Sequence, residues 1–239
     1  MRIEEYEKLY TQEENHWWFK GTRRILFTLL NKFEKRRNLK ILDAGCGTGM
    51  IVKNLEKYGE PIGVDISDEA IKFSKERNIN IEKGSVEALP FEDNTFDLIT
   101  SIDVIYHKWV NYDKKALQEI NRTLKQDGRL LIQVASYNFM KSNHDEAVFT
   151  ERRYTKKRLK TLLEQNGFQI EKITYSNTIL FPIALIKRLT EKKKHESEIK
   201  PVSKITNKIL TNILNFEAKL LKSVNFPFGL SIVAIAKKR

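Results

Sequence analysis

Hydrophobic residues recur at two different periods along this chain, and the change between them divides it. Over residues 1–37 the apolar side chains return at spacings near 3.6, which predicts helix. From Leu39 onward, short apolar runs alternate with amphipathic segments, a pattern typical of a parallel sheet covered by helices on both faces. The predicted strands are 40–44, 61–66, 79–83, 96–102, 129–135, 168–175 and 230–236, and the predicted helices between them are 50–58, 68–77, 112–124, 155–165 and 203–222.

The pattern loosens after the fifth predicted strand. Residues 137–153 read as a polar loop that contains aromatic side chains. About fifty residues then separate the last two predicted strands, far more than an ordinary connection needs. We therefore predict an inserted helical subdomain at about 178–227, followed by the final strand at 230–236.

The composition is that of a globular domain, with 41% apolar and 31% charged residues in a chain of 239. The single cysteine, Cys46, cannot form an internal disulfide and fits a reducing compartment. The amino terminus lacks the apolar core of a secretory signal, and no apolar run is long enough to span a bilayer. We therefore expect a cytoplasmic protein.

Positive charge is concentrated in the last third of the chain. Residues 1–151 carry 23 Lys/Arg against 25 Asp/Glu, whereas residues 152–239 carry 20 against 6. This asymmetry indicates an anionic partner or, alternatively, a solvated lysine-rich surface. Residues 178–200 combine an apolar segment with a lysine cluster, so they either contact an anionic membrane surface or pack internally. A peripheral position at the inner membrane face is the alternative to a purely cytoplasmic one.

A glycine-rich loop follows the first predicted strand. The strand runs into Asp43 and then into Gly45, Gly47 and Gly49, a G-x-G-x-G spacing that permits a tight turn and close approach of a ligand. A carboxylate beside this loop favours a ligand with a cationic amino group and repels pyrophosphate. Asp65 ends the next strand, where an acidic residue accepts hydrogen bonds from ribose hydroxyls. Capping the following helix is the alternative role, for which Ser67 and Asp68 are better placed.

Five segments spread over residues 38–136 resemble the class I S-adenosylmethionine-dependent methyltransferases: LDAGCGTG, GVDIS, GSVEALPF, NTFDLITSIDVIYH and LQEINRTLKQDGRLLI. The resemblance implies an α/β, Rossmann-like fold with a seven-stranded, mostly parallel sheet. It also implies S-adenosyl-L-methionine as cofactor and S-adenosyl-L-homocysteine as product. The implied cofactor-binding residues in this range are Asp43, Gly45, Cys46, Gly47, Gly49, Asp65, Ile66, Ser85, Val86 and Ile102.

The amino-terminal segment carries a second set of characteristic residues, Glu14-x-His16-Trp17-Trp18-Phe19-x-x-x-Arg23-Arg24. It resembles the HWWF leader of methyltransferases encoded among cell-envelope and lipid-glycan genes. His16, Trp17 and Arg23 are predicted to close over the cofactor, because a tryptophan covers a nucleoside and a guanidinium binds a carboxylate. A core-packing helix is the alternative. The predicted parts are thus a helical lid (1–37), the S-adenosylmethionine-binding core (38–136) and acceptor-side elements (137–239).

Three residues are candidates for removing a proton from the methyl acceptor. His107 follows the fourth predicted strand, and His144 and Asp145 follow the fifth, at the sheet edge where such sites open. Each could equally be a loop residue that forms hydrogen bonds. Methyl transfer can also proceed without a general base, by positioning of the acceptor alone. The four histidines lack metal-ligand spacing, so no metal is expected.

We predict methyl transfer to a small-molecule or lipid- or glycan-linked acceptor, at oxygen, by a monomer or a dimer. Nucleic acid is a disfavoured partner. The alternative is a non-catalytic or RNA-directed nucleotide-binding protein that uses its basic last third.

Overall fold

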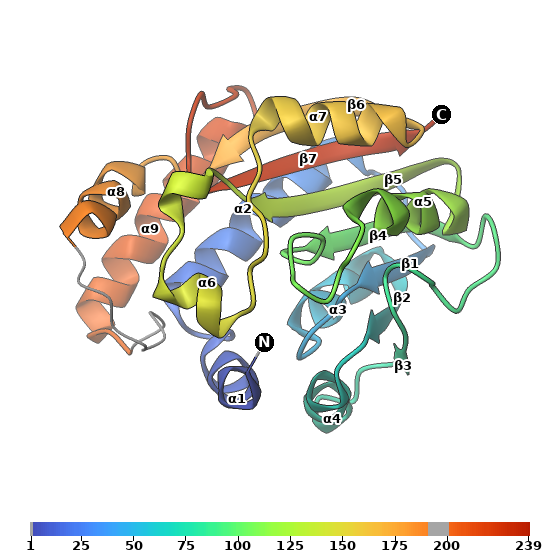
Figure 1. The fold of residues 1–239 in the computed structure, drawn as a ribbon, viewed down its shortest axis with the longest axis horizontal. Coiled ribbons are helices and arrows are strands. Elements are labelled where there is room, and N and C mark those ends of the chain that lie inside the picture. The colour runs from blue at the N-terminus through green and yellow to red at the C-terminus, as the bar shows by residue number, and fades with distance from the viewer. Residues whose placement is uncertain (1, 191–200) are drawn as a thin grey trace.

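Seven strands form one sheet in the order β3-β2-β1-β4-β5-β7-β6 (Figure 1). The computed structural model describes residues 2–190 and 201–239, without the side chains of residues 143 and 144. Every neighbouring pair is parallel except those made by β7, which runs antiparallel to both β5 and β6. The strands are β1 (Leu39–Ala44), β2 (Gly59–Asp65), β3 (Ile81–Lys83), β4 (Phe96–Ile102), β5 (Leu124–Ala135), β6 (Phe168–Ser176) and β7 (Ser231–Lys238).

Helices cover both faces of the sheet, so the central strands are apolar on both sides. Successive residues of β1 serve different cores: Ile41 packs with the helices of one face, and Leu42 packs with those of the other. The predicted mostly parallel α/β fold is therefore confirmed. The helices are α1 (Ile3–Gln12), α2 (Trp17–Phe33), α3 (Met50–Leu55), α4 (Asp68–Glu76), α5 (Asp113–Thr123), α6 (Asn143–Ala147), α7 (Lys156–Gln165), α8 (Phe181–Thr190) and α9 (Lys204–Leu221), with short 3₁₀ turns at Glu56–Tyr58 and Asn138–Met140.

The prediction of continuous helix over residues 1–37 is wrong at one point. Helix α1 ends at Gln12, and α2 begins at Trp17 with a new cap, the Nδ1 atom of His16 accepting a hydrogen bond from the amide of Trp18. Between the two helices, the buried carboxylate of Glu13 accepts the hydroxyl of Thr48 in the glycine loop. Residues 137–153 also contain a short helix, α6, where a loop was predicted.

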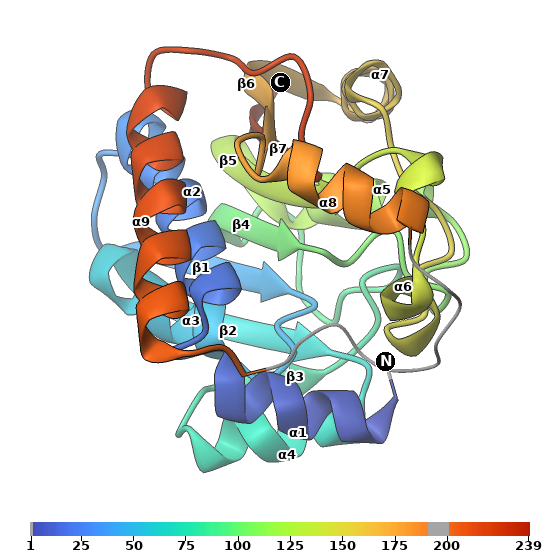
Figure 2. The same cartoon turned by 90° about the vertical axis from the view of Figure 1, so that its left-hand side faces the viewer.

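Helices α2 and α9 lie side by side although the 170 residues of 34–203 separate them in the chain (Figure 2). The α2 residues Ile25, Leu26, Leu29 and Leu30 are buried in the same core as Leu214 of α9. The two helices are in close contact at Gly21, where a Cβ atom would lie 2.2 Å from the Cδ1 atom and 2.6 Å from the Cβ atom of Leu214. Only glycine fits at this contact. Because α2 and α9 share one core, they form one layer over the sheet.

Replacing Gly21 with Ala is therefore expected to destabilise the protein, although alanine is the better helix former by about 1 kcal/mol. The added methyl group forces α2 and α9 apart, and overpacking of this kind costs about 1–3 kcal/mol. Chemical denaturation measures the effect. The double variant Gly21→Ala/Leu214→Ala should show less than the sum of the two single losses, because alanine at position 214 removes the Cδ1 and Cγ atoms that the added methyl group would meet at 2.2 and 2.9 Å, leaving only the contact with Cβ. Strict additivity would show that the two helices do not meet at this point.

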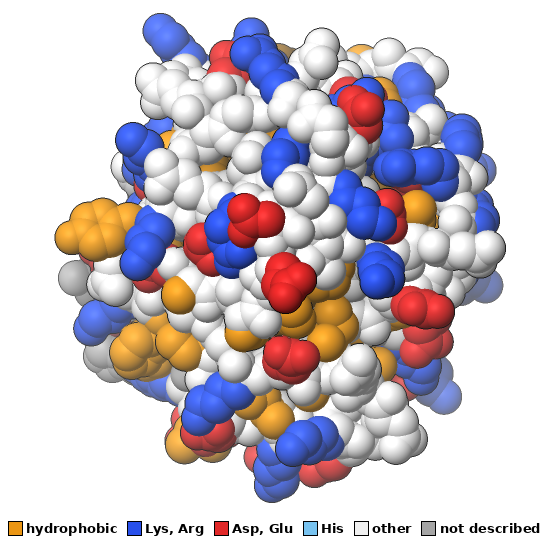
Figure 3. Space-filling model, turned by 90° about the vertical axis from the view of Figure 1, so that its right-hand side faces the viewer, with side chains coloured by type: hydrophobic (Ala, Val, Ile, Leu, Met, Phe, Trp, Pro, Cys, Tyr) orange, Lys and Arg blue, Asp and Glu red, His pale blue; other side chains and the backbone are white. Residues whose placement is uncertain are grey.

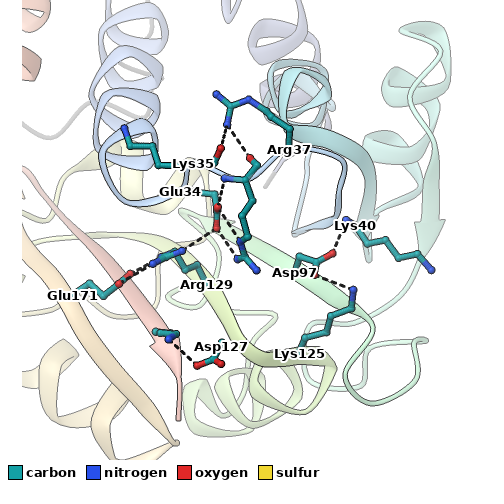
Figure 4. Close-up of polar contacts among 11 residues, drawn as sticks. Glu34, Lys35, Arg37, Lys40, Asp97, Lys125, Asp127, Arg129 and Glu171 are labelled. Carbon is teal, nitrogen blue, oxygen red and sulfur yellow. Dashed lines mark hydrogen bonds and ion pairs between the residues drawn. The ribbon is translucent and has the colours of Figure 1, made fainter.

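A network of ion pairs lies at the end of the sheet opposite the glycine loop (Figure 4). Glu34, which is fully buried, receives hydrogen bonds from Arg36 and from Arg129 of β5. Arg129 also pairs with Glu171 of β6 through two nitrogens, at 2.7 and 3.0 Å. Burial by itself raises the pKa of Glu34, but the arginine hydrogen bonds outweigh it and hold this pKa below its usual range. The network joins the end of α2 to two strands.

Helices α8 and α9 occupy the chain between β6 and β7, the segment predicted to be an insertion. Within this segment, the buried carboxylate of Glu217 on α9 accepts the amides of Thr178 and Ile179, which links α9 to the chain just after β6. In the described parts of the chain, no helix is both long and apolar enough to cross a membrane. The predicted division into lid, core and acceptor-side parts stays a prediction.

Candidate functional site

A cavity of about 640 Å³ opens at the carboxyl ends of the parallel strands. Residues that follow β1, β2, β4 and β5 form its floor, and α1, α2, α8 and α9 contribute its walls. This is the edge at which open α/β sheets bind their ligands. Figure 2 shows these helices around the strand ends.

The glycine loop forms one wall of the cavity. Gly45, Gly47 and Gly49 have φ values of 87°, 55° and 84°, in the left-handed region that favours glycine. A Cβ atom on Gly45 would lie 2.4 Å from Val104, whereas one on Gly47 would meet only Leu9, at 4.0 Å. A side chain at Gly47 would therefore take up space that a ligand can use. Gly49 does not line the cavity; it precedes α3 as its cap.

Asp65 lies at the end of β2, where its two carboxylate oxygens bind two different loops. One oxygen accepts from the amide of Gly47 at 2.9 Å, and the other accepts from the amide of Ser67 at 3.0 Å. Burial raises the pKa of Asp65, opposed by these hydrogen bonds. Ser67 caps α4 by accepting from the amide of Ala70, as predicted, which leaves Asp65 available to the cavity.

Asp43 is almost fully buried at the end of β1. Its Oδ1 atom accepts a hydrogen bond of 2.6 Å from the hydroxyl of Thr100 on β4. Burial raises the pKa of Asp43 to about 7, and the nearby charge of Asp65 adds to the increase. A cationic group in the cavity would stabilise the ionised form.

Helix α1 covers the cavity and is fastened there by Arg77, an arrangement that the sequence did not reveal. The guanidinium of Arg77 donates to the carbonyls of Tyr10 and Thr48, at 2.8 and 2.9 Å, and lies 4.2 Å from the ring centre of Tyr10. It also pairs with Glu13, whose carboxylate accepts the hydroxyl of Thr48. Burial raises the pKa of Glu13, against the effect of these partners. These contacts join α1, the glycine loop and the end of α4.

The predicted lid residues His16, Trp17 and Arg23 all line the cavity. The amide of Trp17 donates to Asn207 of α9 at 2.7 Å, which joins the first turn of α2 to the insertion. The Arg23 guanidinium donates to the backbone carbonyls of Glu13 and Glu14. Burial lowers the pKa of Arg23. In this arrangement Arg23 orders the α1–α2 connection.

The other half of the cavity contains a second polar cluster, centred on Asp103. This residue directly follows β4 with a left-handed φ of 60°. Its Oδ2 atom accepts a hydrogen bond of 2.7 Å from Gln133, which is buried in β5, and the hydroxyl of Tyr106 donates to the same carboxylate. Burial raises the pKa of Asp103 to about 6. Its position beyond the fourth strand was the available sequence signal for a site residue.

Two of the three predicted proton acceptors line the same half of the cavity. Burial lowers the pKa of His107 to about 4, so the imidazole is neutral at pH 7, and its Nδ1 atom has no hydrogen-bond partner within the described residues. Asp145 accepts two hydrogen bonds of 2.9 Å from Arg153. Burial raises its pKa, but this pairing outweighs burial and holds the pKa below its usual range. The side chain of His144 lies outside the described residues.

The cavity thus brings together most of the predicted site. Among the described residues, no group of histidine, cysteine and acidic side chains could hold a metal ion. The predicted cofactor-binding residues that line the cavity are His16, Trp17, Arg23, Asp43, Gly45, Cys46, Gly47, Asp65, Ile66, Ser85, Val86 and Ile102.

Comparison with known proteins assigns the family. A family model described as a methyltransferase domain matches residues 42–132. The chain is 36% identical over 193 residues to an uncharacterized protein of Methanocaldococcus jannaschii, with 77% of this chain and 78% of that protein covered. With the fold described above, these matches show that the chain belongs to the class I S-adenosylmethionine-dependent methyltransferases.

Solved structures share the fold over nearly the whole chain. The crystal structure of a methyltransferase from Thermotoga maritima, described as a possible histamine N-methyltransferase, superposes with a TM-score of 0.63 at 20% identity, covering 99% of this chain and 96% of that one. Phosphoethanolamine N-methyltransferase 2 of Haemonchus contortus, solved with S-adenosyl-L-methionine, gives a TM-score of 0.61 at 19% identity, with 90% and 52% covered. The methyltransferase domain matched by residues 42–132 indicates S-adenosyl-L-methionine as the cofactor of this chain.

Proposed function

We propose that this protein transfers the methyl group of S-adenosyl-L-methionine to an oxygen atom of a small-molecule or a lipid- or glycan-linked acceptor. The observation that carries the proposal is that one cavity holds two different polar sites. The glycine loop with Asp43 and Asp65 lies on one side, and the cluster around Asp103 lies on the other. The cofactor supplies an electrophilic methyl group on its sulfonium.

The chain's own residues suit the cofactor's three parts. Asp65 would accept the ribose hydroxyls, and Asp43 would hold the cationic amino group of the methionine part. Ser85 and Val86 would border the adenine. The loop at Gly47 leaves room for the ligand against the backbone. Trp17 and His16 would close the opposite side, beneath α1.

The assignment to an acceptor of the cell envelope rests on the HWWF leader and on the apolar part of the cavity wall. The residues Glu14-x-His16-Trp17-Trp18-Phe19 resemble the leader of methyltransferases encoded among cell-envelope and lipid-glycan genes, which supports membership of that subgroup. Leu180, Ile183 and Ala184 of the α8 region line the cavity beyond the Asp103 cluster. An acceptor with a polar, reacting end and an apolar body fits such a wall.

Asp103 is the side chain best suited to take the proton of an acceptor hydroxyl. Its neighbours Gln133 and Tyr106 hold the carboxylate in place, and a pKa near 6 keeps most of it ionised at pH 7 while raising its proton affinity. Asp145 is less suitable, because Arg153 occupies both of its oxygens. His107 would then orient the acceptor through its Nδ1 atom.

Asp103→Asn is expected to lower the transfer rate by about 10²- to 10⁴-fold, the usual contribution of a general base. The wild-type rate should rise with pH through about 6, as Asp103 loses its proton, and this dependence should be absent from the variant. Cofactor affinity, measured by calorimetry with S-adenosyl-L-homocysteine, should stay within a few fold of wild type. A variant that transfers methyl groups at the wild-type rate would remove this role.

The acceptor class can be tested with labelled cofactor. The protein and S-adenosyl-L-methionine with an isotopically labelled methyl group are incubated with separate small-molecule, lipid, glycan and RNA extracts. Mass spectrometry should find the label in the small-molecule, lipid or glycan fraction, on oxygen. Label on RNA alone, or label on nitrogen or carbon, would contradict the proposal, and cofactor binding without any labelled product would favour a non-catalytic protein.

A further inference from the structure

Helix α8 exposes a row of large apolar side chains. Ile183, Ile186 and Leu189 are each more than half exposed. At about 100° per residue they occupy one side of the helix. Ile183 also lines the cavity, so this apolar side of α8 begins at the cavity rim.

Helix α9 carries a second apolar row on the side that faces away from the sheet. Ile205, Ile209 and Phe216 are each more than half exposed and fall on one line along the helix. On the opposite side, Leu214 and Ala218 are buried against α2. The exposed row therefore lies on the side of α9 that does not pack against α2.

Positive charge borders both rows. Residues 181–190 and 201–222 carry six Lys/Arg side chains and a single acidic one, Glu217, which is buried. Lys204, Lys208 and Lys219 flank the apolar row of α9, and all three are exposed. An apolar row bordered by lysines is typical of helices that lie at the surface of an anionic bilayer.

Both helices contribute to the wall of the cavity. Ala184 of α8 and Leu210 of α9 line it, and Ile183, which also lines it, is more than half exposed. Both helices lie on the side of the molecule that faces the reader in Figure 2. The opposite side, in Figure 3, shows acidic and basic side chains interspersed, with only small hydrophobic patches between them. Helices α8 and α9 thus combine an apolar row and positive charge with a position beside the cavity.

We propose that α8 and α9 dock this protein on an anionic phospholipid surface, with the cavity mouth facing the lipid. The proposal rests on the proposed function in one respect, because it supplies the route by which a lipid-linked acceptor reaches Asp103. A second copy of the chain is a poorer occupant, since pairing these faces would bring lysine rows together. The sequence-based prediction named residues 178–200; of these, 191–200 lie outside the described residues.

Vesicle co-sedimentation of the full chain tests the docking. The protein should sediment with vesicles of phosphatidylcholine mixed with phosphatidylglycerol, stay in solution with phosphatidylcholine alone, and be released by added salt. Lys204→Glu/Lys208→Glu should weaken binding at least 30-fold, as expected for about 1 kcal/mol per lysine. Lys114→Glu/Lys115→Glu on α5 changes the net charge equally and should have little effect.

The apolar rows need a test of their own. Ile205→Ser/Ile209→Ser and Ile186→Ser/Leu189→Ser should both reduce binding at every salt concentration without lowering the melting temperature. Equal losses for the α5 and α9 charge variants would mean unspecific attraction and overturn the proposal. A second result would also overturn the proposal. In it, the wild-type protein is a dimer that does not bind vesicles, and the serine variants are monomers.

The assay requires no methyl transfer, so its outcome is independent of the proposed function. Vesicle binding without any labelled product would leave the docking intact and contradict the proposed reaction. If the protein yields a labelled lipid product but does not bind anionic vesicles, the proposed reaction is supported and the docking proposal is contradicted.

Discussion

Asp65→Ala is expected to weaken cofactor binding by about 30- to 1,000-fold, or about 2–4 kcal/mol. The change removes the proposed acceptors of two ribose hydroxyls. It also removes the carboxylate that holds the amides of Gly47 and Ser67, so the glycine loop loses one of its links to the end of β2 and keeps the bonds from Gly45 and Cys46 to the Val64 carbonyl. Calorimetry with S-adenosyl-L-homocysteine gives the affinity.

The matched control for this variant is Asp68→Ala, three residues further on. Asp68 is exposed and pairs only with the exposed Lys83 among the contacts of the described residues, so its loss should leave cofactor affinity unchanged. Circular dichroism should report a folded protein for both variants. If Asp65→Ala binds the cofactor as tightly as Asp68→Ala does, the ribose assignment is wrong.

Glu34→Ala is expected to lower the free energy of unfolding by about 2–4 kcal/mol. Removing one partner of a buried ion pair leaves the other charges without compensation, at a cost of about 3–5 kcal/mol. Arg36 is partly exposed, which reduces that cost. Urea denaturation at pH 7 measures the loss, and Glu164→Ala, which removes an exposed pair with Lys160, should change little.

The effect of Glu34 should depend on pH in a defined direction. Its pKa is lowered in the folded protein, so its contribution is complete above its unfolded pKa, about 4.3. The contribution is lost as pH falls through the lower, folded pKa. Wild type and Glu34→Ala should therefore converge in stability under acid conditions. A difference that grows on acidification would show that Glu34 is not held ionised by its arginines.

The parts of the fold that could be predicted are those encoded by a pattern within a few neighbouring residues. The parallel strands are buried on both faces, so each reads as a short apolar run. The glycine loop is also local, because the left-handed φ at Gly45, Gly47 and Gly49 requires a residue type that is visible in the sequence. Asp65 could be predicted because it ends one of these strands.

What the sequence did not reveal depends on residues far apart in the chain. Arg77 binds Glu13 across 64 positions, and neither residue belongs to a recognisable pattern. The contact between Gly21 and Leu214 similarly needs the complete fold. Asp103 is a different case: it lies in the segment NTFDLITSIDVIYH directly after Ile102, but its hydrogen bond with Gln133 of β5 exists only in the folded chain.

The position of β7 has a consequence for the order in which the chain can assemble. This last strand lies between β5 and β6 in the sheet, so β6 has no sheet partner until the final residues have been synthesised. The apolar side of α2 likewise waits for Leu214 of α9. Because synthesis proceeds at about 5–20 residues per second, β6 and this side of α2 stay uncovered for a time on the order of seconds after they have been synthesised.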